Sequence, residues 1–156
     1  MENNMSMVFD AKSQNEGLAR IAIAAFLTET DPTIEEINDI KTAVSEAVTN
    51  AIIHGYGEGD GQVYMRCKLI TGSVRNKNNT YDMNITINIE IRDEGVGIED
   101  IEKAREPLFT TKPELERSGM GFMFMEMFMD ELTVKSERGQ GTTVIMTKNL
   151  KKTFKV

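Results

Sequence analysis

Apolar side chains occupy every second position along two stretches of the chain. Residues 63–69 and 83–91 both follow this alternation, with polar residues between the apolar ones. Because successive side chains of a strand point to opposite faces, both stretches are predicted to be strands with one buried face. The polar, asparagine-rich residues 72–81 between them are expected to form a hairpin loop. Further predicted strands are 5–9, 132–137 and 142–147.

Three other stretches repeat apolar residues at helical spacing. The first, 17–27, follows a Ser-x-x-Glu capping box that starts at Ser13, and the second, 34–53, follows a Thr-x-x-Glu box that starts at Thr33. Both are predicted to be helices that begin at these caps. The third is the methionine-rich stretch 120–129, which is predicted to be a buried helix filled with adaptable side chains.

The remaining segments complete the predicted fold. A short helix is expected at 98–101, and residues 106–120, which hold two prolines and little periodicity, are predicted to be a mobile loop. The elements sum to an α+β fold, a two-layer sandwich in which a mixed, mostly antiparallel sheet carries helices on one face. A chain of 156 residues is long enough to bury one core, so residues 1–156 are expected to form a single domain.

Composition narrows the function classes. The net charge of −7 argues against a direct nucleic-acid binder. The chain lacks a signal-peptide pattern and an apolar run of about eighteen residues, so no membrane contact and a cytoplasmic location are expected. Its single cysteine, Cys67, excludes an intramolecular disulfide and is expected to be buried. The basic residues 148–155 are expected to be a solvated tail, with a partner contact as the alternative.

Glu46, Asn50 and His54 recur every four positions along the predicted helix 34–53. Residues at this spacing share one helix face. Asn50 offers a neutral oxygen that suits a magnesium ion with most of its water retained. Glu46, one turn earlier, is placed to accept a proton from an attacking water or hydroxyl, and His54 is a candidate for the same site. The alternative for each is an ordinary polar side chain on a helix surface or at a helix end.

A carboxylate followed by two glycines, Asp93-x-Gly95-x-Gly97, ends the most regular predicted strand. Glycines let the backbone pass close to a flat ligand. A buried carboxylate needs a hydrogen-bond donor, which an adenine amino group supplies, and Thr143 on the closing strand is placed to assist. This turn and the polar helix face together predict a nucleotide site.

Gly119, Met120 and Gly121 directly precede a predicted helix, whose free N–H groups and positive dipole end favour phosphate. The alternative is a plain junction between a loop and a helix, and the chain has neither a Walker pattern nor a Rossmann fingerprint. Arg105, just before the predicted loop, is a candidate for a phosphate or partner contact, with a solvated arginine as the alternative. The loop carries three residues suited to a bound polyphosphate: Thr110, Thr111 and Lys112.

Arg20 is the one cation within the apolar stretch 17–27. One interpretation is an arginine whose stem lies along an apolar face while its charge reaches water. The other is a charged contact in a protein interface, where the apolar surface also packs.

Four segments resemble, in order, the N box and three glycine boxes of the Bergerat ATPase superfamily, which includes gyrase-type topoisomerases, heat-shock chaperones, histidine kinases and mismatch-repair ATPases. The segments are Glu46–His54, Asp93–Gly97, Gly119–Gly121 and Gly139–Thr143. The resemblance covers nearly the whole chain. Within the superfamily, the chain is similar to the small anti-sigma-factor serine kinases of sporulation in its length, its Glu-Ala-Val-Thr-Asn-Ala N box and its Phe-Thr-Thr-Lys-Pro lid.

The resemblance implies a role for each box. Glu46 would be the general base, Asn50 a magnesium ligand and Asp93 the adenine anchor. The implied cofactors are ATP and Mg²⁺. The glycines implied to shape the pocket are Gly95, Gly97, Gly119 and Gly121, with Thr143 at the adenine end.

The resemblance also implies partners. The protein would bind a sporulation sigma factor and hold it off RNA polymerase, and it would phosphorylate a serine of an anti-anti-sigma protein. Family members of this type pair into dimers, which are expected here to form through the first helix and the sheet edge.

Three alternatives use the same nucleotide boxes. A histidine kinase needs a phosphoacceptor histidine on a separate helical domain, and a gyrase-type ATPase needs a transducer domain. The chain has no residues left over for either. A non-catalytic module that sequesters a sigma factor under nucleotide control is the remaining alternative, although such a module has no need of the base Glu46.

Overall fold

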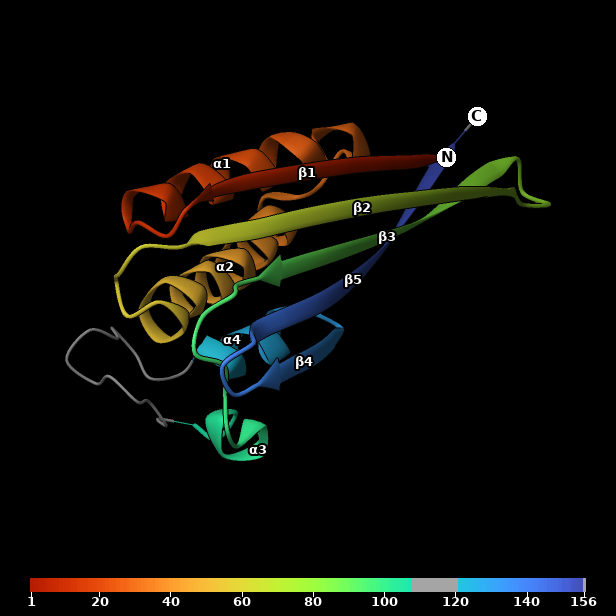
Figure 1. The fold of residues 1–156 in the computed structure, drawn as a ribbon. Coiled ribbons are helices and arrows are strands. Elements are labelled where there is room, and N and C mark those ends of the chain that lie inside the picture. Colours follow the sequence, from red (N-terminus) through yellow and green to blue (C-terminus); the bar gives the residue numbers. More distant parts are fainter. Residues whose placement is uncertain (108–120, 156) are drawn as a thin grey trace.

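The computed structural model describes residues 1–107 and 121–155, which form an antiparallel sheet covered by helices (Figure 1). The sheet has five strands in the order β1-β2-β3-β5-β4, and every pairing in it is antiparallel. The predicted mostly antiparallel sheet is therefore confirmed, and no parallel pair occurs among the described strands. The strands are β1 (Glu2–Asp10), β2 (Gln62–Arg75), β3 (Thr80–Arg92), β4 (Glu131–Glu137) and β5 (Gly141–Lys155).

The long helices pack against one face of this sheet, as Figure 1 shows. They are α1 (Gln14–Leu27), α2 (Ile34–Asn50) and α4 (Gly121–Phe128), and a shorter α3 (Ile101–Ala104) lies at one end. The alternating apolar residues of β2 and β3 are buried under the helices, as their period of two requires. These layers confirm the predicted α+β sandwich. No helix among the described residues is long and apolar enough to cross a membrane.

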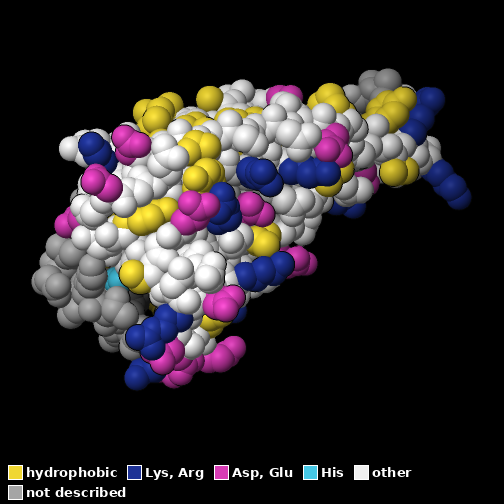
Figure 2. Space-filling model, in the orientation of Figure 1, with side chains coloured by type: hydrophobic (Ala, Val, Ile, Leu, Met, Phe, Trp, Pro, Cys, Tyr) yellow, Lys and Arg dark blue, Asp and Glu magenta, His cyan; other side chains and the backbone are white. Residues whose placement is uncertain are grey.

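The opposite face of the sheet is covered by no other layer of the described chain. Figure 2 shows Lys and Arg side chains interspersed with Asp and Glu over this face. Some of these charges pair locally: Lys68 lies 3.0 Å from Glu2, and Arg92 lies 2.8 Å from Glu94. The mixture of signs gives this face no single strong charge.

Only one of the two predicted capping boxes forms. Thr33 Oγ1 accepts a hydrogen bond from the Glu36 N–H at 3.1 Å, and the Glu36 carboxylate accepts from the Thr33 N–H at 2.7 Å. The predicted box at Ser13 is wrong, because Ser13 has helical backbone angles and its side chain caps nothing. The carboxylate of Glu16, expected in that box, instead accepts a hydrogen bond from the Ser45 hydroxyl on α2.

The strands are longer than the alternation predicted. The expected loop 72–81 is mostly strand, and only residues 76–79 form the turn between β2 and β3. The expected basic tail, 148–155, is also wrong, because it is the second half of β5 and pairs with the first half of β3. Thr86 donates to Asn149 across the two strands at 2.9 Å, and Lys152 ties β5 to the start of α2 by donating to Glu36 at 2.7 Å.

The methionine-rich helix α4 buries one face only. Met125 is fully buried and Phe122 nearly so, whereas Met127 exposes 61% of its surface. The prediction of a wholly buried helix is therefore wrong for the outer face. Cys67 is buried as predicted, and its burial raises the pKa of its thiol to about 12, so the side chain is neutral at physiological pH.

Candidate functional site

A cavity of about 710 Å³ opens where the C-terminal end of α2 meets the ends of β3 and β5. Its wall includes Asn50 and His54 from the helical face and Asp93 and Gly97 from the turn after β3. Residues that the sequence pattern singled out in two distant segments therefore meet in one hollow. The volume lies within the roughly 300–1,000 Å³ typical of small-ligand pockets.

The chain after α2 tightens the wall of this cavity. Residues Ala51–Gly55 form a π-helical turn, and His54 lies within it, half-buried against the cavity. Such turns inside helices often occur at functional sites, because they displace one side chain from regular helical spacing. The predicted end of the helix near residue 53 falls within this turn.

Glu46 and Asn50 converge at the N-terminus of α4. A Cβ atom placed on Gly121 would lie 3.2 Å from Asn50 Oδ1 and 3.2 Å from Glu46 Oε2. Both side chains are half-buried, and Asn50 lines the cavity while Glu46 lies beside it. A carboxylate oxygen and an amide oxygen therefore lie close to the same point, where a side chain at position 121 would be tightly packed.

Asp93 lies at the other side of the cavity and exposes 6% of its surface. Its Oδ1 accepts a hydrogen bond from the Gly95 N–H at 2.9 Å, and its own N–H donates to the Thr142 carbonyl at 2.9 Å. Burial raises the pKa of this carboxyl, and the hydrogen bond from Gly95 opposes part of the rise. The structure thus holds a buried carboxylate at the cavity wall, where a ligand amino group would complete its hydrogen bonds.

The turn after Asp93 is pressed between two backbone segments. A Cβ on Gly95 would come within 2.0 Å of the Gly55 carbonyl oxygen, and the Val96 N–H donates to that oxygen at 2.9 Å. On the other side, Gly97 has a φ of +73°, and a Cβ there would come within 2.1 Å of the Glu137 carbonyl oxygen. These contacts require glycine at both positions.

The strand β5 places its two adjacent threonines on opposite faces. Thr142 lines the cavity and Thr143 does not; Thr143 lines a smaller hollow of about 310 Å³, together with Arg92 and Lys135, to which Thr142 also contributes. The expectation for Thr143 therefore disagrees with its placement, because side chains alternate along a strand and the sequence did not decide which of the pair turns inward.

The model of one protein family, described as the histidine kinase-like ATPase domain, matches residues 9–148 of this chain. The anti-sigma F factor of Clostridium acetobutylicum is 55% identical over 148 residues, which cover 95% of this chain and 94% of that protein. The chain belongs to the anti-sigma F factor family. Those of Halalkalibacterium halodurans and Bacillus velezensis are 53% and 52% identical, and each alignment covers 97% of this chain and 96% of the relative.

In this anti-sigma F family member, Arg105, the candidate for a phosphate or partner contact, lies at the cavity. Arg105 lines the wall, and its guanidinium donates to the Glu126 carboxylate of α4, with Nε 2.9 Å from Oε1. The ion pair joins the chain just before the undescribed residues to the helix just after them. The predicted phosphate contacts Thr110, Thr111, Lys112, Gly119 and Met120 lie outside the described residues.

Arg20 lies away from the cavity, on α1. Its side chain exposes 46% of its surface, and Nε lies 3.8 Å from the Glu16 carboxylate one turn earlier. Glu16 also accepts the hydrogen bond from Ser45, the residue that precedes Glu46 on α2. The same helix also exposes apolar side chains, at Leu18 (47%) and Ile21 (70%).

Sequence reasoning missed several residues of the site. Thr142, Glu126 and Tyr56 carry no spacing signal of their own, because each acts through a contact with a segment far away in the chain. No group of three His, Cys, Asp or Glu residues that would hold a metal ion occurs among residues 1–107 and 121–155.

Proposed function

We propose that this protein is an anti-sigma factor and a protein serine kinase that transfers the γ-phosphate of ATP to a serine of an anti-anti-sigma factor. The observation that carries the proposal is the convergence of Glu46 and Asn50 at Gly121, in the same hollow as the buried Asp93. A binding-only pocket needs the anchor at Asp93 but not a carboxylate beside the phosphate end.

The adenine end of ATP would bind at Asp93. The carboxylate accepts a hydrogen bond from the adenine 6-amino group, and Thr142 rather than Thr143 is the nearby hydroxyl on the cavity wall. Gly95 and Gly97 hold the turn that presents this carboxylate. The triphosphate then extends toward the N-terminus of α4, whose first N–H groups favour negative charge.

The residues present fit a magnesium ion. Asn50 Oδ1 and Glu46 Oε2 are both oxygen donors, and both approach one point at Gly121. Magnesium binds oxygen and keeps several waters and phosphate oxygens, so it does not require a cluster of carboxylates. When bound, the ion neutralises and orients the phosphates. We assign the direct contact to Asn50.

Glu46 is the proposed general base. Its carboxylate accepts the proton of the substrate serine hydroxyl as the hydroxyl oxygen forms its bond to the γ-phosphorus. The bond between the γ-phosphorus and the bridging oxygen breaks, and ADP leaves with that oxygen. His54 and Arg105 line the same cavity, where they contribute to nucleotide binding. Phosphoryl transfer depends mainly on such positioning and charge stabilisation.

The anti-sigma role follows from the family, and it implies a sigma factor as a binding partner. We propose that a sigma factor of the sigma F type binds a surface that includes Arg20, whose charge stands beside exposed apolar side chains on α1. This combination of a cation with apolar surface is typical of protein interfaces. We also propose that two copies pair through α1 and the edge strand β1, whose outer side has no neighbour among the described strands.

The test compares wild-type protein with Glu46→Gln, using ATP labelled at the γ-phosphate and a candidate anti-anti-sigma protein. The wild type is expected to phosphorylate a serine, and Glu46→Gln is expected to bind ATP but to lose about a hundredfold or more of the transfer rate. Glu131→Gln is the matched control, because Glu131 is an exposed carboxylate on β4, away from the cavity.

Two other results would change the assignment. If Glu46→Gln transfers phosphate at the wild-type rate, Glu46 is not the base. If the wild type binds ATP and holds a sigma factor but phosphorylates no such protein, the chain is a nucleotide-gated sequestering module, and the kinase proposal fails.

A further inference from the structure

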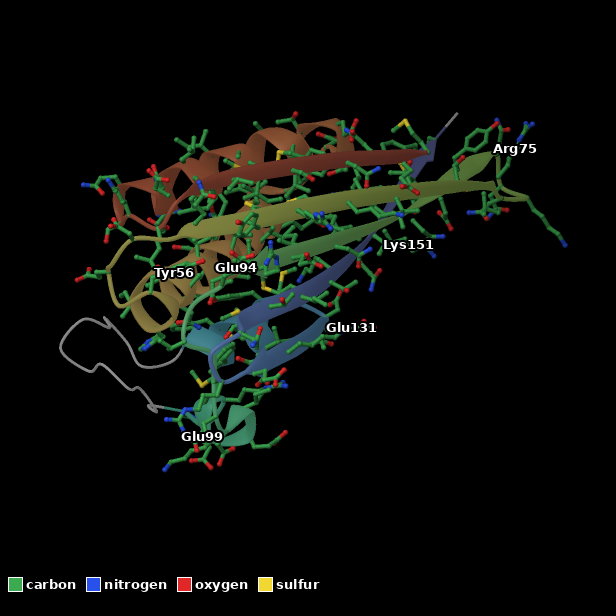
Figure 3. All side chains as sticks on the ribbon, in the orientation of Figure 1. Tyr56, Arg75, Glu94, Glu99, Glu131 and Lys151 are labelled. Carbon is green, nitrogen blue, oxygen red and sulfur yellow. The ribbon has the colours of Figure 1, made fainter. Side chains whose placement is uncertain are left out.

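Tyr56 joins three segments of the chain at the adenine end of the cavity. Its hydroxyl accepts a hydrogen bond from the Glu94 N–H at 2.7 Å and donates one to the Gln62 carbonyl at 2.6 Å. Figure 3 shows Tyr56 directed toward the strand end that carries Glu94. The hydroxyl both donates and accepts, and so ties the turn after β3 to the first residue of β2.

The Tyr56 ring is also held in place, by packing against Gly61. A Cβ placed on Gly61 would come within 2.3 Å of two ring carbons, so the ring lies directly on the backbone of Gly61. The Tyr56 N–H donates to the Ala51 carbonyl at 3.1 Å, which connects the residue to the π-helical turn. The side chain is half-buried, and only a glycine at position 61 leaves room for it.

The residue held by Tyr56 is the immediate neighbour of Asp93. Because the Glu94 N–H belongs to the peptide unit that follows Asp93, the hydrogen bond from it fixes the orientation of the backbone that carries the carboxylate. The turn has further supports at Gly55 and Thr142, but those contact Val96 and the N–H of Asp93 itself. Tyr56 is the side chain that supports the carbonyl side of Asp93.

We propose that Tyr56 is a positioning residue for the adenine anchor: through Glu94 it aims the Asp93 carboxylate at the 6-amino group of adenine. The inference rests on the proposed function, which assigns adenine to Asp93. The inference makes a specific prediction. Displacing the Asp93 carboxylate would remove the contact with the 6-amino group, whereas the contacts of other residues with the phosphates and the ribose would remain. The discrimination between adenine and other purines should then depend on Tyr56.

The experiment measures the affinities of ATP and inosine triphosphate by titration calorimetry, since inosine carries an oxygen in place of the 6-amino group. Tyr56→Phe removes only the hydroxyl, and it is expected to weaken ATP binding about fivefold while leaving inosine triphosphate binding unchanged. Tyr81→Phe is the matched control, because Tyr81 lies near the β2–β3 turn, outside the cavity.

A second variant displaces the Tyr56 ring without removing its hydroxyl group. Gly61→Ala puts a methyl group into the space of the ring, and Gly61 does not have the positive φ that would make alanine strained. It is expected to reduce the preference for ATP over inosine triphosphate as Tyr56→Phe does. Gly72→Ala is its control, since a Cβ there meets nothing within 4 Å. Thermal unfolding of all four variants separates a loss of discrimination from a loss of folded protein.

The outcomes are distinguishable. A reduced preference for ATP in both site variants and an unchanged preference in both controls supports the positioning role. A wild-type preference in Tyr56→Phe overturns it, even if the variant is less stable. A wild type that binds ATP without preferring it over inosine triphosphate overturns both the inference and the adenine contact of Asp93. A wild type that binds neither nucleotide overturns the proposed function itself.

Discussion

At the scale of single residues, Asp82 on β3 and Asp93 just after β3 have opposite pKa shifts. Burial raises the pKa of Asp93, whereas hydrogen bonds from Asn76 and Thr153 lower the pKa of the half-buried Asp82. A raised carboxyl pKa means that the ionised form costs stability, and a lowered one means that the ionised form adds stability.

These shifts predict opposite effects of two matched substitutions. Without nucleotide, Asp93→Asn is expected to be at least as stable as the wild type at pH 7, because it removes a buried charge. That advantage should shrink as pH falls through the raised pKa of Asp93, above the ordinary value of 3.8. Asp82→Asn should lose stability at pH 7, and the loss should persist until pH falls below 3.8.

Urea unfolding of the three proteins between pH 3 and pH 8 measures both effects. An Asp93→Asn protein that is less stable than the wild type at neutral pH and gains on acidification would contradict the assigned shift. Asp93→Asn should also lose ATP affinity, which the same samples allow to be checked.

At the scale of elements, long-range contacts decide what local patterns leave open. The two capping boxes have the same sequence form, yet only the one at Thr33 closes, because Glu16 has a competing partner in Ser45 on another helix. Alternation predicted the buried halves of β2 and β3 correctly. It missed the outer halves, where cross-strand hydrogen bonds between polar side chains replace apolar burial.

The two boxes give a paired prediction. Thr33→Ala removes a formed cap and is expected to destabilise the protein by about 1 kcal/mol. Ser13→Ala removes no capping hydrogen bond and is expected to change stability very little. Chemical unfolding midpoints of the two variants would decide this, and equal losses in both would show that the difference between the caps is not real.

For the candidate site too, local sequence patterns predicted some residues, and long-range contacts decided the others. Glu46, Asn50, Asp93 and the glycines were predictable because their spacing and residue types carry the signal. The choice between Thr142 and Thr143 was not, since it depends on the register of β5 against β3. Tyr56 and Glu126 were not either, because the contact of Tyr56 with Glu94 and that of Glu126 with Arg105 each join residues far apart in the chain.

At the scale of the whole molecule, the nucleotide cavity and the proposed partner surface lie on different elements. The cavity lies at the C-terminal end of α2, while Arg20 and its exposed apolar neighbours lie on α1. Glu16 bridges them, since it contacts Arg20 and also the hydroxyl of Ser45, next to Glu46. A partner bound at α1 would therefore contact a helix that is hydrogen-bonded beside the proposed base.

The proposed pairing through α1 predicts the effect of one surface charge. Ile21→Asp places a carboxylate on the exposed face of α1, and it is expected to convert the dimer to a monomer in sedimentation velocity experiments. Ile34→Asp is the control, because Ile34 is exposed by 80% but begins α2, where a negative charge is tolerated. A dimer that survives Ile21→Asp would remove α1 from the interface.

The π-helical turn Ala51–Gly55 has a consequence for the length of the chain. Removing one residue from it would restore an α-helix, and each residue in an α-helix advances the direction of the side chain by about 100°. A π-helical turn holds one residue more than an α-helical turn, so the chain after the deletion would keep nearly its present direction, whereas the side chains within the turn, including His54 at the cavity, would return to regular helical spacing. The helix should therefore survive the deletion while the cavity wall changes, and substitutions at the buried Ile52 or at Gly55, where a Cβ would lie 2.8 Å from Asp93 Oδ1, should be costly. A library of single-residue deletions across this turn therefore probes backbone geometry separately from side-chain chemistry.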